Sequence, residues 1–187
     1  MKDNIILIGF MGCGKSTVGK VLAKKMRYIF LDTDQTIESR QHMPISKIFE
    51  KKGEEYFRKL ETDTVREMVE TTNKSIISTG GGLPLREENS QILKNLGFVV
   101  YLNVKKETVL KRLKGDTKRP LLAGGNVEEK VEQMISYRDP IYQVGAHMEI
   151  HTDDMSVEKV AEEIIRNYEI MQRKGPCFEK DKEGINL

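Results

Sequence analysis

The chain has 187 residues, with 31 Lys or Arg and 29 Asp or Glu, and a formal net charge of +2. A single domain of this length buries about 70% of the surface of its unfolded chain, so its core needs no metal or disulfide. Because basic and acidic residues are interspersed and nearly balanced, we expect neither a nucleic-acid partner nor a membrane partner. Neither a membrane span, nor a signal peptide, nor a disulfide is indicated, so we expect a cytoplasmic protein.

Short apolar runs recur along the chain and predict the strands of a buried parallel sheet. These runs cover residues 5–8, 28–31, 76–77, 98–102 and 148–150. Between them, apolar residues return at helical spacing, as they do after Lys15. The alternation predicts an α/β fold in which five parallel strands lie between layers of helices.

Polar residues mark the start of two later helices. Asn126, with Glu129 three residues on, resembles a capping box. Ser156 precedes another apolar stripe at helical spacing. Both stripes are interpreted as core-facing surfaces rather than as cofactor sites.

Two segments lack such patterns. Residues 115–125 mix Gly, charged residues and Pro, and predict a mobile loop between helices. Residues 174–187 are polar and predict a flexible C-terminal tail. Residues 1–173 are therefore expected to form a single domain.

The most specific chemical signal is G-x-x-x-x-G-K-S at residues 9–16, directly after the first predicted strand. Between a strand and a helix, this pattern is typical of a phosphate-binding loop. Its glycines let successive N–H groups point at an anion, and the helix N-terminus adds about half a positive charge. Lys15 can reach the outer phosphates, and Ser16 is placed to ligate Mg²⁺. The motif predicts nucleotide binding.

Two carboxylates follow the second predicted strand. Asp32 and Asp34 are two residues apart, and in extended backbone such residues project to the same side, so both can face the phosphate site. One could support Mg²⁺ while the other takes or orients the proton of an attacking hydroxyl. The alternative is that Asp34 only caps a helix beginning near Gln35.

Three consecutive glycines, Gly80, Gly81 and Gly82, follow the third predicted strand. They form either an ordinary loop or a bare backbone that a substrate approaches closely. Residues 73–76 lack the acid of the guanine-reading N-K-x-D motif of GTPases, and the H-R-D-x-x-x-x-N and D-F-G motifs of protein kinases are absent. Small-molecule phosphoryl transfer, or nucleotide binding alone, remains.

Taken together, several motifs resemble the shikimate kinase family over about residues 2–170. They are G-F-M-G-C-G-K-S-T at 9–17, D-T-D at 32–34, F-R-K-L-E at 57–61, G-G-G at 80–82, R-P-L-L at 119–122 and Y-R-D-P-I-Y at 137–142. Many kinases share the first motif, and gluconate kinases also have an Asp pair. The combination of F-R-x-x-E, G-G-G and R-P-L-L makes the resemblance specific.

The resemblance implies a three-layer P-loop NTPase fold of the nucleoside-monophosphate-kinase type. It implies a substrate-binding helical region near residues 33–61 and a lid near residues 112–124. The implied reaction transfers the γ-phosphoryl group of ATP, with Mg²⁺, to the 3-hydroxyl of shikimate. We expect shikimate to be the only partner and the protein to be a monomer.

By the same resemblance, three groups of residues share a role. The nucleotide-binding residues are Gly12, Cys13, Gly14, Lys15, Ser16, Thr17, Arg112 and Arg119. The acceptor-binding residues are Asp34, Arg58, Gly80, Gly81, Gly82 and Arg138. Lys15, Asp34 and Arg119 are the implied catalytic residues, and the implied metal ligands are Ser16 and, through water, Asp32.

Physical chemistry supports several of these roles. Phosphoryl transfer develops charge on oxygen, so a cation such as Arg119, delivered by a closing segment, would stabilise the transition state. Arg112 matches a position that stacks near adenine. Arg58 and Arg138 match a clamp on the shikimate carboxylate, which a planar guanidinium suits better than Lys does. Glu61, three residues after Arg58, is placed to orient it.

Alternatives stay open at this point. Taken alone, Arg58, Arg119 and Arg138 could each belong to a solvated surface ion pair. The chain could be another small-molecule kinase, such as a gluconate kinase, or a noncatalytic nucleotide-binding module. Cys13 is interpreted as a small filler of a variable loop position rather than a redox group.

Overall fold

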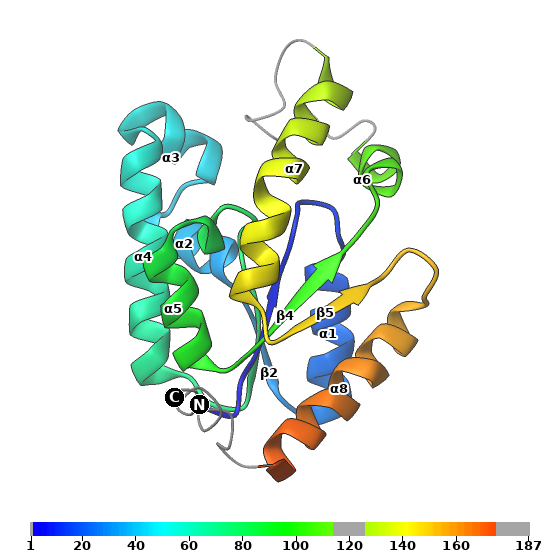
Figure 1. The fold of residues 1–187 in the computed structure, drawn as a ribbon. Helices are drawn as coiled ribbons and strands as arrows, with labels where there is room; N and C mark the ends of the chain where they lie inside the picture. The colour runs from blue at the N-terminus through cyan, green and yellow to red at the C-terminus, as the bar shows by residue number, and fades with distance from the viewer. Residues whose placement is uncertain (1, 114–125, 175–187) are drawn as a thin grey trace, which may run out of the picture.

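The computed structural model describes residues 2–113 and 126–174 (Figure 1). In this part of the chain, five strands form one parallel sheet in the order β2-β3-β1-β4-β5. The strands are β1 (Ile5–Ile8), β2 (Ile29–Asp32), β3 (Ser75–Ser78), β4 (Phe98–Asn103) and β5 (Met148–His151). The predicted α/β fold with five parallel strands is confirmed.

Helices cover both faces of the sheet (Figure 1). On one face, α1 (Lys15–Met26) packs against α8 (Val157–Lys174). The other face carries α4 (Glu54–Thr71), α5 (Glu87–Leu96) and α7 (Val127–Gly145). The shorter helices α2 (Thr33–Gln41) and α3 (Ile45–Lys52) pack beside α4, while α6 (Lys106–Leu113) contacts α7, and a 3-10 turn, η1 (Leu83–Leu85), contacts α5.

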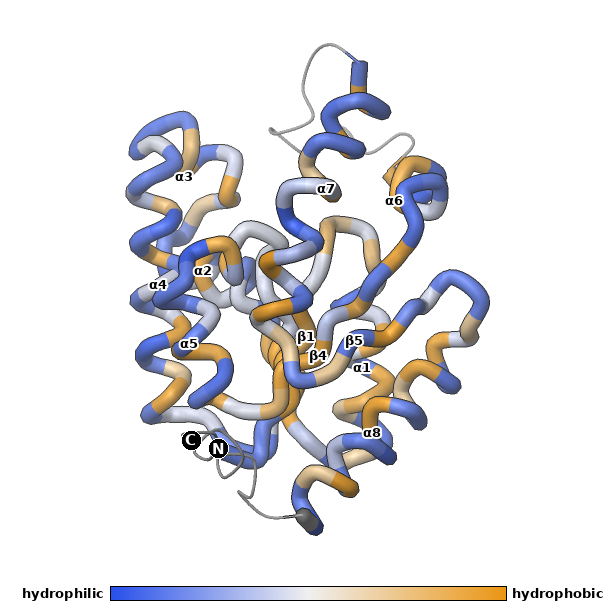
Figure 2. Tube along the Cα trace, viewed as in Figure 1, coloured by the Kyte–Doolittle hydropathy of each residue, from blue (hydrophilic) through white to orange (hydrophobic). Residues whose placement is uncertain are grey.

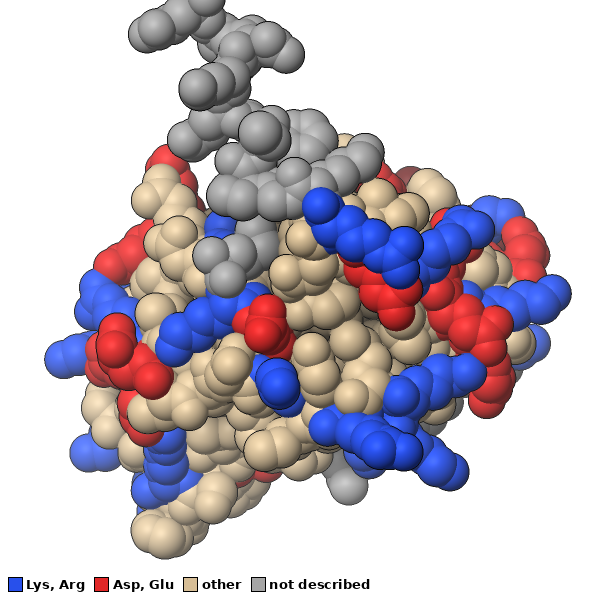
Figure 3. All heavy atoms as spheres, turned by 90° about the horizontal axis from the view of Figure 1, so that it is seen from below, with Lys and Arg blue, Asp and Glu red and all other residues tan. Residues whose placement is uncertain are grey.

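The centre of the sheet is apolar because helices cover it on both sides. All four residues of β1 are fully buried, whereas Ile29 on the edge strand β2 is 64% exposed. Figure 2 shows hydrophobic residues concentrated in the central strands. On the outer face shown in Figure 3, basic and acidic side chains lie beside one another. Within the described ranges, no helix is both long and apolar enough to cross a membrane.

A second, smaller apolar cluster holds α2, α3 and α4 together. Its buried members are Ile37, Ile48 and Phe57, one from each helix. The rings of Phe49 and Phe57 add a contact at 4.9 Å between centroids. The segment predicted as the substrate-binding region, residues 33–61, therefore has a core of its own beside the main core around the sheet.

Both predicted helix starts are confirmed. The Asn126 side chain accepts hydrogen bonds from the N–H groups of Glu128 (3.1 Å) and Glu129 (3.4 Å), the first turn of α7. Ser156 Oγ accepts from Lys159 N–H at 3.3 Å, where α8 begins. Polar side chains thus satisfy N–H groups that have no partner within the helix.

Two predictions fall largely outside the described residues. The loop at 115–125 and the lid near 112–124 lie there, except for the last residues of α6. The tail at 174–187 also lies there from residue 175 onward. Its predicted first residue, Lys174, is instead the last residue of α8.

His147 extends the sheet through its side chain. Its backbone N–H donates to Val99 O at 2.8 Å, and its Nδ1 accepts from Val99 N–H at 3.0 Å, just before β5 begins. Burial, and to a smaller extent Lys94, lowers the pKa of His147. Only the neutral ring leaves Nδ1 free to accept, so the contact requires that form.

We expect the free energy of unfolding to fall as the pH drops through about 6.5, because the unfolded chain then binds a proton that folded His147 excludes. In His147→Asn, Oδ1 can replace the acceptor and nothing titrates, so this part of the pH dependence should vanish. Urea unfolding of both proteins at about pH 7.5 and about pH 5.5 measures the difference. Equal losses of stability in the two proteins would contradict the prediction.

Candidate active site

The loop after β1 has the backbone that its glycines predict. Gly9, Gly12 and Gly14 have φ values of 137°, 78° and 102°, which side chains rarely tolerate. A Cβ on Gly9 would also lie 2.7 Å from Leu102 O. The loop ends at Lys15, the first residue of α1, so its N–H groups lie beside a helix N-terminus. This geometry suits an anion.

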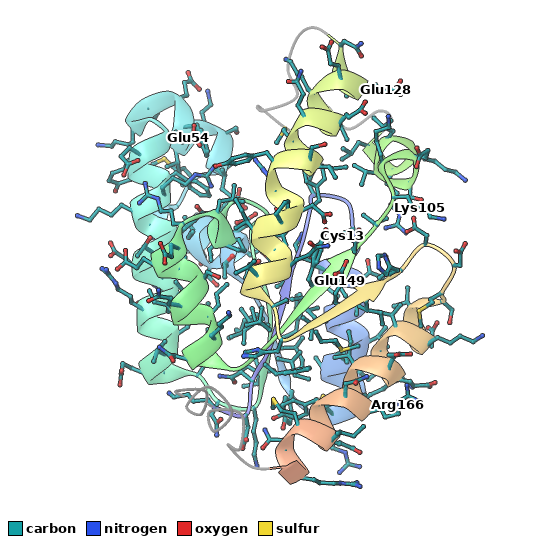
Figure 4. The ribbon with its side chains drawn as sticks, in the orientation of Figure 1. Cys13, Glu54, Lys105, Glu128, Glu149 and Arg166 are labelled. Atoms are coloured by element: carbon teal, nitrogen blue, oxygen red, sulfur yellow. The ribbon has the colours of Figure 1, made fainter. Side chains whose placement is uncertain are left out.

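Lys15 folds back over this loop. Its Nζ donates to Gly9 O at 2.8 Å and to Phe10 O at 2.9 Å, and lies 3.6 Å from Cys13 Sγ. The ammonium group is thus buried within the loop. Cys13 is buried in the same loop (Figure 4), which fits its interpretation as a filler.

Oxygen ligands gather next to the start of α1. Ser16 Oγ donates to Asp32 Oδ2 at 3.2 Å and lies 3.5 Å from Ser78 Oγ at the end of β3. Hydroxyl and carboxylate oxygens are ligands that Mg²⁺ prefers, and one or two of them suffice when phosphates and waters complete the shell. The donor set therefore fits Mg²⁺. Among the described residues no group of three or more His, Cys, Asp or Glu could hold a metal on its own.

The prediction that Asp32 and Asp34 share one side of an extended segment is wrong. Asp32 ends β2 and caps α2, its Oδ1 accepting from the N–H groups of Asp34 (3.1 Å) and Gln35 (3.3 Å). Asp34 lies in the first turn of α2, which begins at Thr33 rather than near Gln35. Both carboxylates nevertheless line the same cavity, because the turn from strand to helix occurs at that cavity.

The three glycines after β3 form a tightly packed wall. Gly80 N–H donates to the buried Thr33 Oγ1 at 3.0 Å, and a Cβ on Gly80 would lie 2.5 Å from Asp34 Oδ1 and 3.1 Å from Glu61 Oε1. A Cβ on Gly82 would clash with the Arg58 guanidinium. The bare backbone is therefore required by the close approach of Asp34, Glu61 and Arg58.

Arg58 is held by two carboxylates of its own helix. Its Nη1 donates to Glu61 Oε2 at 2.7 Å, which confirms the predicted orienting pair. Its Nη2 and Nε also donate to Glu54 Oε1, at 2.8 and 3.2 Å. Glu61 is 1% exposed, and this burial raises its pKa to about 7, against the opposing effect of Arg58. Arg58 therefore lies in a fixed orientation beside Gly82.

Arg138 lies beside Tyr142, the residue of α7 that contacts the glycine wall. It is buried on α7, and its guanidinium lies 5.6 Å from the centre of the Phe10 ring. One turn along α7, Tyr142 Oη donates to Gly81 O at 2.5 Å. Burial raises the pKa of Tyr142 to about 12, although its hydrogen bond with Arg138 opposes the shift. Arg58 thus lies directly against the glycine wall, whereas Arg138 is connected to it through Tyr142. No ion pair among the described residues involves Arg138.

A cavity of about 420 Å³ joins the phosphate loop to these elements. Its lining includes Gly12, Cys13, Gly14, Lys15, Ser16, Thr17, Asp32, Asp34, Gly80, Gly81 and Arg112. Arg112 Nη1 donates to Gly12 O at 2.8 Å and so ties α6 to the loop. Gly82, Arg58 and Arg138 are not part of this lining, although Arg58 lies directly against Gly82. Arg119 lies outside the described residues.

Sequence reasoning missed several contacts at the site. Thr33 bonds Gly80 and Tyr142 bonds Gly81, but each of these contacts joins residues far apart in the sequence. Glu54 bonds Arg58, but other acidic residues near Arg58 were equally possible partners. Ser78 and Thr79, at the end of β3, also line the cavity and were not predicted as site residues. Their position directly before the glycines was the one available signal.

Comparison with known proteins identifies the family. A family model described as shikimate kinase matches residues 11–169. Shikimate kinases of Thermodesulfovibrio yellowstonii and Thermoanaerobacter pseudethanolicus are each 42% identical to the chain. The first alignment covers 89% of this chain and 95% of the relative, and the second covers 92% and 99%. The chain belongs to the shikimate kinase family.

Solved structures of shikimate kinases are similar to this chain over most of its length. A shikimate kinase from Acinetobacter baumannii in complex with shikimate has a TM-score of 0.86 at 38% identity, over 93% of this chain and 96% of that one. The shikimate kinase from Aquifex aeolicus has a TM-score of 0.78 at 37% identity, over 89% and 96%. The predicted P-loop fold is confirmed. A gluconokinase from Sinorhizobium meliloti, at 13% identity and a TM-score of 0.58 over 93% and 98%, shares the fold alone.

The placement of Asp34 between the phosphate loop and the glycine wall generates a prediction. Asp34→Asn keeps the size of the side chain but removes its ability to accept a proton, so kcat should fall by about 100-fold or more. ATP binding, measured by calorimetry, should persist because the loop is untouched. A kcat close to that of the wild type would remove Asp34 from the catalytic residues.

Proposed function

We propose that the protein transfers the γ-phosphoryl group of ATP to the 3-hydroxyl of shikimate. The observation that carries this proposal is the position of Asp34. Its carboxylate lines the cavity that contains the phosphate loop and also lies against Gly80, on the same side as Glu61, the ion-pair partner of Arg58. A molecule with a hydroxyl at Asp34 and a carboxylate near Arg58 would therefore have its hydroxyl beside the nucleotide.

The donor half would use the loop and Lys15. Backbone N–H groups and the N-terminus of α1 hold the phosphates, and Lys15 exchanges its bonds to Gly9 O and Phe10 O for phosphate oxygens. Ser16 and Asp32 are placed to hold Mg²⁺, which when bound neutralises charge on the outer phosphates. Arg112, which lines the cavity and donates to Gly12 O, would stack near the adenine, as the resemblance implies.

The acceptor half would use the glycine wall and the charged residues around it. Arg58 and Arg138 hold the carboxylate, which fixes the ring against Gly80, Gly81 and Gly82. Asp34 then accepts or orients the proton of the attacking hydroxyl. Holding both reactants in line supplies much of the catalysis in phosphoryl transfer.

Two segments would have separate roles in this reaction. Residues 33–61, with their separate core, would bind the acceptor, and residues 112–124 would act as a lid. We propose that the protein acts as a monomer in the cytoplasm.

An ADP-release assay with ATP, Mg²⁺ and a panel of acceptors tests the function. We expect the wild type to release ADP when shikimate is present, and the Lys15→Ala variant to release none. Turnover with gluconate instead would favour the second kinase class, and no turnover with any acceptor despite ATP binding would favour a noncatalytic module.

The carboxylate clamp generates a further prediction. Losing one charge-assisted contact costs about 1.5–3 kcal/mol, so Arg58→Ala or Arg138→Ala should raise the KM for shikimate by roughly 10- to 150-fold. ATP affinity without shikimate should change little. The wild type should bind an analogue with an amide in place of the carboxylate poorly, and each variant should discriminate less between acid and amide. If all three proteins rank the two compounds alike, no clamp exists.

Arg119 keeps the role that the resemblance implies. Arg119→Ala should lower kcat more than it raises the KM for shikimate, because its charge would act in the transition state. Steady-state kinetics measures kcat and the KM for shikimate separately. A raised KM with unchanged kcat would make Arg119 a ground-state binding residue.

A further inference from the structure

Arg58 is already paired in the empty site. The carboxyl groups of Glu54 and Glu61 both accept hydrogen bonds from its guanidinium, at 2.8 and 2.7 Å. Glu54 Oε1 bridges Nε and Nη2, and Glu61 Oε2 takes Nη1. Even without a contribution from Glu61, the negative charge of Glu54 balances that of the guanidinium, so the Arg58–Glu54 pair has no net charge. An incoming carboxylate would therefore find little electrostatic attraction while Glu54 remains.

The two glutamates differ in how easily they can leave. The Glu61 side chain is 1% exposed and lies beside Gly80 and Asp34, so moving it would expose buried polar groups. The Glu54 side chain is 56% exposed at the outer end of α4, next to α3 (Figure 4). Water can solvate its carboxylate as soon as it turns away. Glu54 is thus the exchangeable partner and Glu61 the permanent one.

We propose that Glu54 is a resident counter-ion that occupies Arg58 in the empty site and gives way to the carboxylate of the acceptor. This inference rests on the proposed function, because it takes shikimate as the incoming carboxylate. The exchange breaks the ion pair between Arg58 and Glu54 and forms one between Arg58 and the carboxylate of the acceptor. The free energy of binding therefore gains only the difference between the two ion pairs. Glu54 thereby lowers the affinity of Arg58 for any carboxylate and reserves it for one that makes further contacts at Asp34 and the glycine wall.

The test compares Glu54→Gln with Glu55→Gln. Both changes remove one negative charge from the first turn of α4. Glu55, however, pairs with Arg86 Nη2 at 2.6 Å instead of with Arg58. Because an exposed ion pair contributes about 0.2–1 kcal/mol, the KM for shikimate should fall by roughly 1.5- to 5-fold in Glu54→Gln. It should stay at the wild-type value in Glu55→Gln.

The amide analogue of shikimate separates exchange from a general change of shape. An uncharged amide has no charge with which to displace Glu54, so its affinity should be the same in wild type and Glu54→Gln. The preference for acid over amide should therefore rise by the same factor as the KM for shikimate falls, and only in Glu54→Gln.

The outcomes are distinct. A KM for shikimate that is unchanged or raised in Glu54→Gln, or a fall of equal size in Glu55→Gln, overturns the counter-ion role and leaves the proposed function standing. A raised KM would mean that Glu54 orients Arg58 while the acceptor is bound. A wild-type protein that does not phosphorylate shikimate overturns the proposed function and, with it, this inference.

Discussion

The site depends on a turn that has no side chains. At residues 80–82, Asp34, Glu61 and Arg58 approach so closely that a methyl group on Gly80 or Gly82 would displace them. From α7, Tyr142 Oη donates a hydrogen bond to the carbonyl of Gly81, which lies between these two glycines. Helices α2, α4 and α7 can converge on the end of β3 only because the turn occupies so little space. The distances between the proposed acceptor-binding groups are therefore set by backbone atoms, which move less than side chains do.

The two halves of the site differ in charge. The phosphate loop collects positive potential from a helix N-terminus and a buried Lys15, and has oxygen ligands only at its edge. The acceptor half instead buries Glu61, whose raised pKa shows how unfavourable its isolated charge would be. Arg58 makes that burial tolerable. The phosphate half therefore keeps positive potential for an anion, whereas the acceptor half pairs its buried carboxylate with Arg58.

How far the sequence predicted this arrangement depends on the range of each contact. Continuous apolar runs such as residues 5–8 identified the strands, and the glycine spacing identified the loop, because both signals are local. The geometry of Asp32 and Asp34 was predicted wrongly, since Asp32 both ends a strand and caps a helix, and the pattern alone does not show where one becomes the other. Glu54, Glu55 and Glu61 all lie within four residues of Arg58, and only the structure shows which of them pair with it. The Tyr142 contact spans 61 residues and left no local signal.

The separate apolar cluster of α2, α3 and α4 has a consequence for how such proteins diversify. Ile37, Ile48 and Phe57 pack on one another apart from the main core, so a substitution among them leaves the packing of the central strands unchanged. Regions with few buried contacts open at lower free energy than the rest of a domain. Amide hydrogens of these helices would then exchange through local opening, without global unfolding. A lineage could accumulate changes in this unit, and so shift the shape of the pocket it borders, while the sheet and the phosphate loop stay intact.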